Sequence, residues 1–262
     1  MLSKTMNTEA LYHPDRKIRR IRPLKAWHHF QNLIANKEDT SQVFHIIEAL
    51  NGSALINDLK RFLSTKAGQE RFAERRNLPP YLDDHEMLKK LPAGSLGRSY
   101  VDFMEREGLT AQGLVDEYES FTTDVPDYED AIQWYGNRLR DTHDLLHVLT
   151  TYGRDALGEA CVLGFSYSQN KGPGVLFIAY MAAREVAKGM PKGAATLKAV
   201  REGQKLGKQA EKIAAQDILA LLPQPIDSVR EQLGIKRPKI YHAIHEICRD
   251  NGFDPYAALA AS

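Results

Sequence analysis

The chain has 262 residues, of which 43% are hydrophobic and 26% charged, which suits one large domain or two small ones with an ordinary core. Its formal charge of +1 argues against nucleic-acid binding, and its two cysteines are too few for a disulfide framework and fit a reducing compartment. The first twenty residues are polar and basic, and no run of 18 apolar residues occurs, so we expect neither a signal peptide nor a membrane-spanning helix.

Residues 1–22 lack helical periodicity and carry a basic cluster of Arg16, Lys17, Arg19, Arg20 and Arg22. We predict that this segment is a flexible, solvated tail. Because Ile18 and Ile21 lie among the basic residues, contact with an anionic membrane surface or an acidic partner stays open as a second interpretation.

From Pro23 onward, apolar residues recur at helical spacing, and no alternating strand pattern appears. The predicted helices begin at Pro23, at a Thr40 cap and at a Ser95 cap, and cover residues 55–63, 68–75, 109–121, 127–151, 158–168, 175–183, 192–222, 226–233 and 239–249. Pro79-Pro80 is predicted to break the chain. The fold class is therefore predicted to be all-α, with a single multi-helix domain over residues 23–262.

Arg98 is a candidate for binding an anionic group, since it follows Gly97 in the first turn of the helix capped by Ser95. A guanidinium in a crowded region can form paired hydrogen bonds to a carboxylate or a phosphate. A structural salt bridge is an equally good interpretation of this residue.

A metal site is predicted near the middle of the chain. His143 and His147 are four residues apart, so both imidazoles leave a helix on one face, and Asp144 lies beside the first. Glu159 is twelve residues beyond His147, which is about 18 Å along an unbroken helix. If the chain turns back near Gly153, two antiparallel helices bring these side chains to one level.

Two imidazoles and two carboxylates suit one divalent ion, and zinc fits this set, although manganese, iron or cobalt are not excluded. The histidine pair alone could be plain polar surface. A zincin would need a glutamate at position 144, and Asp144 is one methylene shorter, so ligation is favoured over base catalysis.

Other residues around this motif have weaker signals. Arg140 is predicted to share the histidine face of the helix, where it would hold an anionic substrate or pair with Asp144. The apolar segments within residues 161–183 are predicted to wall the site and to offer a slot for a hydrocarbon chain. His242 and His245 are interpreted as surface residues.

The chain resembles the ubiquinone (coenzyme Q) biosynthesis family known as Coq-four. The resemblance lies in His143-Asp-x-x-His147 followed by Glu159 and extends over residues 22–250. The other segments that carry it are Arg22-Pro-Leu-Lys-Ala-Trp27, Asn36-Lys-Glu-Asp-Thr40, Leu91-Pro-x-Gly-Ser-Leu-Gly-Arg98 and Tyr152-Gly-x-Asp155.

The resemblance implies a metal-dependent lyase that removes the C1 carboxyl group of a polyprenylated 4-hydroxybenzoate, in some accounts with hydroxylation at that carbon. His143, Asp144, His147 and Glu159 would then bind the metal, expected to be zinc. For this reaction we further expect Arg98 or Arg140 to orient the acid as catalytic residues, a role that the resemblance does not itself assign. It also implies a peripheral protein, here cytoplasmic on the inner face of a bacterial membrane.

Its expected partners are the prenylated aromatic substrate, a membrane surface, other ubiquinone biosynthesis proteins and a second copy of the chain in a homodimer, but no nucleic acid. The alternatives are a non-catalytic lipid-binding scaffold of a ubiquinone biosynthesis complex and a metal-dependent hydrolase. The hydrolase would need a further histidine and aspartate, for which His85 and Asp217 are available without supporting spacing.

Overall fold

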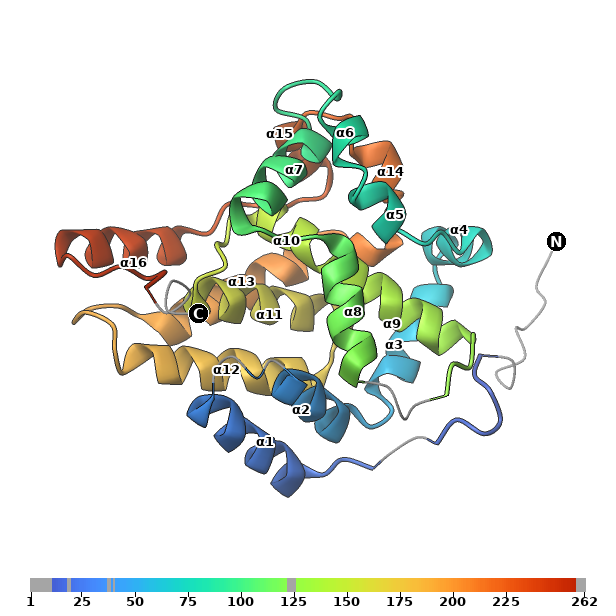
Figure 1. The fold of residues 1–262 in the computed structure, drawn as a ribbon, viewed down its shortest axis with the longest axis horizontal. Helices are drawn as coiled ribbons and strands as arrows, with labels where there is room; N and C mark the ends of the chain where they lie inside the picture. The colour runs from blue at the N-terminus through green and yellow to red at the C-terminus, as the bar shows by residue number, and fades with distance from the viewer. Residues whose placement is uncertain (1–10, 18–19, 37–38, 40, 122–125, 258–262) are drawn as a thin grey trace.

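The structure is a computed structural model that describes residues 11–17, 20–36, 39, 41–121 and 126–257. All regular elements in these ranges are helices, which confirms the all-α prediction (Figure 1). The first half contains α1 (Pro23–Ala35), α2 (Ser41–Asn51), α3 (Ala54–Leu63), α4 (Lys66–Glu74), α5 (Pro79–Leu82), α6 (His85–Leu88), α7 (Leu96–Glu107), α8 (Ala111–Phe121) and α9 (Ala131–Asp141). The second half contains α10 (His143–Thr150), α11 (Ala156–Asn170), α12 (Pro173–Ala187), α13 (Thr196–Gln209), the 3-10 helix η2 (Ile213–Ala215), α14 (Ile218–Leu221), α15 (Ile226–Gln232) and α16 (Lys239–Asp250).

The helix α11 is the centre of the fold. It packs against both α12 and α13, and α12 in turn packs against α2, which lies beside α1 (Figure 1). Small and branched side chains such as Ala160 and Val162 of α11 and Val200 of α13 are fully buried in the main core. Because α11 is enclosed on these sides, its first turn is held in a fixed position against α10.

The predicted helix starts agree with the structure where it describes them. Pro23 occupies the first position of α1, and the Ser95 hydroxyl accepts a hydrogen bond from the Arg98 amide at 3.2 Å. Pro79-Pro80 begins the short helix α5 instead of breaking the chain, since the first helical turn needs no amide donor. The predicted Thr40 cap lies outside the described residues.

The prediction of a single helix over residues 127–151 was wrong. The segment forms two helices, α9 and α10, which meet at Thr142. The Thr142 hydroxyl donates to the carbonyl oxygen of Arg138 at 2.9 Å, and its ψ of 2° departs from the helical value. The break gives α10 a direction of its own, and it separates Arg140 from the histidines.

The long helix predicted over residues 192–222 was also wrong. The chain leaves the helical conformation at Ala210, which is extended, and continues through η2 and α14. The Gln169 side chain stabilises this departure by donating to the carbonyl oxygens of Gly207 and Glu211 at 3.2 and 2.9 Å. Tertiary hydrogen bonds thus override a sequence with good helix propensity.

The described part of the predicted tail lies against the domain. Leu11 is buried in a cluster with Ile56 and Leu59, and Arg16 donates to Asp130 at 2.6 Å. These contacts differ from the solvated tail that the sequence predicted. Residues 1–10 and 18–19 lie outside the described residues, so the boundary at residue 22 stays a prediction. Within the described ranges, no helix has the length and apolar character that crossing a bilayer requires.

Candidate metal centre

The predicted helix reversal is present between α10 and α11. The helix α10 ends at Thr150, and the next residue, Thr151, adopts a left-handed conformation with φ of 65°. The carboxylate of Asp155 then caps α11 by accepting the amides of Leu157 and Gly158 at 3.2 and 3.1 Å. The chain therefore reverses direction within the five residues 151–155, between the end of α10 and the start of α11.

Gly153 is needed in this turn because two tyrosine side chains pack closely against its Cα, and not because its backbone is left-handed. A Cβ atom there would lie 2.9 Å from the phenol oxygen of Tyr241 and would collide with that of Tyr256. The Gly153 amide itself donates to Tyr241 at 2.9 Å. The predicted bend near Gly153 is therefore confirmed, and its left-handed residue is Thr151.

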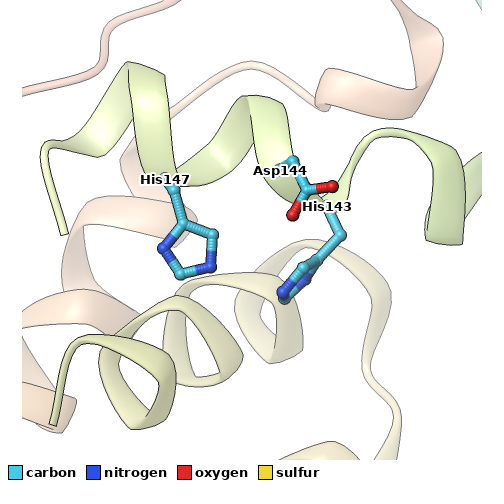
Figure 2. A group of neighbouring side chains, drawn as sticks. All are labelled: His143, Asp144 and His147. Atoms are coloured by element: carbon cyan, nitrogen blue, oxygen red, sulfur yellow. The ribbon is translucent and has the colours of Figure 1, made fainter. Parts of the chain in front are cut away.

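The reversal brings Glu159 to the two imidazoles, and Asp144 lies with the imidazoles on α10. One ligand atom from each of His143, Asp144 and His147 lies within 4.8 Å of the others. Figure 2 shows both imidazoles projecting from the same side of α10. The Glu159 carboxylate oxygen Oε2 lies 3.6 Å from Nε2 of His143 and 3.4 Å from Nε2 of His147. The predicted convergence of Glu159 with the imidazoles is therefore confirmed, whereas ligation itself stays a prediction.

His147 has the orientation that a metal ligand needs. Its Nδ1 donates to the carbonyl oxygen of Tyr152 at 3.1 Å, which leaves the lone pair on Nε2. This Nε2 is buried and has no hydrogen-bond partner among the described residues. A buried polar atom without a partner costs free energy, so it indicates a group that the protein binds there. The donor set and this atom fit a divalent cation.

The electrostatics of the site favour ionised side chains. Burial alone would raise the pKa of Glu159, but His147 and His143 outweigh it and hold that pKa well below its usual range. Burial alone would lower the pKa of His143, but the hydrogen bond and charge of Glu159 outweigh it and raise that pKa. Glu159 is therefore available as an anionic ligand, and His143 is the group at which protons compete with a metal.

Acidification should consequently weaken metal binding. Since the pKa of His143 is raised, its protonated form persists above the ordinary imidazole value of about 6.5, and the affinity should fall as the pH drops from about 8 to about 6. Competition with a chromophoric chelator at both pH values measures this change. An affinity that is constant across this range would exclude His143 as a ligand.

A cavity of about 480 Å³ is lined in part by His147. Its walls come from α7, α10, α15, α16 and the turn after α10, and among its lining residues are Phe103, Arg106, Tyr241 and Tyr256. The Phe103 ring stacks on His147 with centroids 5.6 Å apart. None of the lining residues belongs to the segment 161–183, so the predicted apolar wall does not form this cavity.

The two predicted catalytic arginines have other partners. Arg98 donates to the carbonyl oxygen of Lys89 at 2.8 Å and to Asp102 at 3.3 Å. Arg140 donates to Asp141 at 2.8 Å, and the break at Thr142 places it on a different helix from His143, so the predicted shared face was wrong. Their roles toward a substrate stay predictions.

Sequence reasoning missed two residues near the site. Arg154 lies in the turn, and its Nε is 3.7 Å from the Glu159 carboxylate. The sequence could have indicated this contact, because Arg154 is only five residues before Glu159. His245 was interpreted as a surface residue, but its side chain is only 19% exposed and Nε2 lies 3.3 Å from Oδ2 of Asp155. The interpretation of His245 was wrong because its contact with Asp155 joins two distant segments, and no local sequence pattern indicates such a contact.

Comparisons with known proteins agree with this geometry. Residues 24–239 match the family described as coenzyme Q (ubiquinone) biosynthesis protein Coq4. The chain belongs to the Coq4 family. The resemblance seen in its motifs is thereby confirmed, and the family's name associates it with ubiquinone biosynthesis.

Individual Coq4 relatives match over shorter stretches. The mitochondrial COQ4 homologue of Anopheles gambiae is 30% identical over 115 residues, which are 44% of this chain and 38% of that protein. The COQ4 protein of Paracoccidioides brasiliensis is 25% identical over 194 residues, which are 71% of this chain and 62% of that protein. The matched part therefore spans less than two thirds of either relative.

A crystal structure supports the Coq4 fold. A protein from Nostoc punctiforme, described as a ubiquinone biosynthesis protein, superimposes with a TM-score of 0.63 and 21% sequence identity. The match covers 82% of this chain and 99% of that one. At this identity the likeness concerns the fold alone.

Proposed function

We propose that this Coq4 protein is a metal-dependent decarboxylase that removes the C1 carboxyl group of a polyprenylated 4-hydroxybenzoate, either alone or oxidatively with hydroxylation at C1. The observation that carries the proposal is the buried Nε2 of His147, which has no hydrogen-bond partner in the described structure and faces Glu159 at 3.4 Å. Of the four residues that would hold the ion, His147 also lines the cavity, so this residue connects the candidate metal site with the space for a substrate.

The residues that would hold the ion are His143, Asp144, His147 and Glu159, and zinc is the metal that this set fits best. A bound divalent ion supplies Lewis-acid stabilisation for a carboxylate or phenolate oxygen. The carbonyl oxygen of Tyr152 fixes the His147 ring, and Arg154 adds positive charge beside Glu159.

The cavity suits the aromatic part of such a substrate. A volume of about 480 Å³ lies within the range of small-molecule sites, and Phe103, Tyr241 and Tyr256 offer ring surfaces. A long prenyl chain would extend beyond it. Neither Arg98 nor Arg140 lines this cavity, and the two are paired with Asp102 and Asp141. Their proposed role of orienting the acid group requires a substrate that extends beyond the cavity and displaces these carboxylates.

Membrane association belongs to this proposal because a polyprenylated substrate resides in lipid. At the start of α1 the side chains of Ile21, Leu24 and Trp27 are 55%, 87% and 45% exposed, and the exposed Lys17 and Arg20 precede them. Apolar side chains beside basic ones suit the surface of an anionic membrane. We also propose that the protein binds the inner face of the bacterial membrane, forms a homodimer and contacts other ubiquinone biosynthesis proteins.

The zinc-loaded protein should convert a short-chain prenylated 4-hydroxybenzoate into a product that has lost the mass of carbon dioxide, and the protein isolated from cells should carry a prenylated phenol. Mass spectrometry of the reaction and of lipid extracts measures both. Lipid binding with no conversion would favour the non-catalytic scaffold, whereas hydrolysis of a generic phosphoester would favour the hydrolase.

A further inference from the structure

Arg154 lies at the open edge of the candidate metal site. The site is closed at His147, whose side chain is 1% exposed, whereas the side chains of Glu159 and Arg154 are 34% and 32% exposed. Oε2 of Glu159 faces the two imidazoles, and Oε1 of the same carboxylate lies 3.7 Å from Nε of Arg154. A molecule that approaches this edge from solvent therefore meets Glu159 and the Arg154 guanidinium together.

The Arg154 guanidinium has donors available for a further anion. Its 3.7 Å contact with Glu159 is an ion pair that is too long for a hydrogen bond, and no residue of the described structure accepts a hydrogen bond from its N–H groups. A guanidinium has five N–H donors in a planar arrangement that matches the two oxygens of a carboxylate. Arg154 can therefore receive an acid group without first losing a hydrogen bond within the protein.

Other arginines near the site are already engaged. Arg98 and Arg140 each donate to an aspartate, at 3.3 and 2.8 Å. Arg106 and Arg230 line the cavity, where the former donates to a glutamate at 3.0 Å and the latter to two backbone carbonyl oxygens at 2.9 Å. Among the described residues, Arg154 is the one arginine or lysine that forms an ion pair with any of the four candidate ligands.

The charge of a loaded site explains why such an arginine is needed. The two positive charges of a divalent ion are cancelled by the carboxylates of Asp144 and Glu159 when the imidazoles are neutral. A centre of this kind exerts little net attraction on an anionic molecule. Arg154 adds one positive charge on the exposed side of the site, where an acid would arrive.

We propose that Arg154 binds the carboxylate of the acid substrate and holds it at the metal site, an inference that rests on the proposed function. The guanidinium turns away from Glu159 and donates two parallel hydrogen bonds to the acid group. Arg154 directly follows Tyr152 and Gly153, which both line the cavity, so the acid group lies at the boundary between the cavity and the metal site.

The test compares R154Q and R154K with R76Q, a control at an arginine that is 41% exposed and whose Nε lies 3.4 Å from Glu74. Calorimetry measures how each zinc-loaded protein binds a short-chain prenylated benzoate and the matching uncharged benzamide. Neither ligand has the phenol oxygen of the proposed substrate, so binding is measured without turnover.

The wild type should bind the benzoate more tightly than the benzamide. R154Q should bind the benzoate about 10- to 100-fold more weakly and the benzamide equally well, since the variant lacks the charged hydrogen-bond donor. R154K should keep part of the preference for the acid, and R76Q should match the wild type. Zinc affinity of R154Q, measured against a chromophoric chelator, should equal or exceed that of the wild type, because a positive charge beside Glu159 is removed.

An unchanged preference for the benzoate in folded, zinc-loaded R154Q overturns the role of Arg154 and leaves the decarboxylase intact. The same unchanged preference with weaker zinc binding shows that Arg154 only positions Glu159, which also overturns the inference. A wild type that binds the benzoate through Arg154 but releases no carbon dioxide from the prenylated 4-hydroxybenzoate supports the acid site and overturns the proposed function.

Discussion

Replacement of His147 with alanine should abolish stoichiometric metal binding while the helical circular dichroism stays essentially unchanged. The side chain supplies the buried Nε2 between Glu159 and the cavity, and alanine leaves no donor in its place. Loss of a residue that only supports a ligand costs 10- to 100-fold in affinity, so loss of the ligand should leave below about 0.1 metal ion per chain. Plasma mass spectrometry after equilibration with zinc measures this.

The matched control is His13→Ala, because this histidine is 46% exposed and hydrogen-bonds within the N-terminal segment. Its metal content should equal that of the wild type. Retention of a full equivalent of zinc by the His147 variant would remove this imidazole from the site and with it the basis of the proposed chemistry.

Replacement of Gly158 with alanine should damage both the fold and the metal site. A Cβ atom at this position would overlap the carbonyl oxygen of Gly153 and lie 2.8 Å from its carbonyl carbon, and a backbone group cannot rotate away as a side chain can. The turn between α10 and α11 must then open, which moves the adjacent Glu159 from the imidazoles. We expect a loss of about 1–3 kcal/mol in unfolding free energy, together with weaker zinc binding.

Gly136→Ala is the matched control for this substitution. Gly136 lies inside α9, and its added Cβ would meet nothing closer than a methyl group of Leu55 at 3.8 Å. This variant should gain about 0.5–1 kcal/mol, as is usual for alanine in place of glycine in a helix. Urea unfolding and zinc titration of both variants measure the effects. Equal stability of the Gly158 variant and the wild type would show that the turn is not tightly packed.

The candidate site was predictable from sequence because its four ligand residues fall within 17 positions. Helical spacing fixes how His143 and His147 relate, and only one reversal was needed to place Glu159. The position of that reversal was predicted within two residues. Its left-handed residue was not, because a threonine in that conformation is uncommon and has no sequence signal.

The helix breaks at Thr142 and Ala210 were not predictable by the same reasoning. Neither position has an adjacent glycine or proline. The break at Thr142 involves its own hydroxyl, which donates to the carbonyl oxygen of Arg138 four residues earlier, and the break at Ala210 is stabilised by the distant Gln169 side chain. The same holds for His245, whose partner Asp155 is 90 residues away in the chain. Local periodicity identifies helices, whereas the ends of helices and the walls of the cavity depend on tertiary contacts.

X-ray absorption spectroscopy of the zinc-loaded protein tests the central claim most directly. A site formed by His143, Asp144, His147 and Glu159 predicts one zinc ion per chain with nitrogen and oxygen neighbours at about 2.0–2.2 Å and the multiple scattering of two imidazoles. A shell that contains sulfur at about 2.3 Å, or that lacks imidazole scattering, would contradict a metal centre on the α10–α11 helix pair.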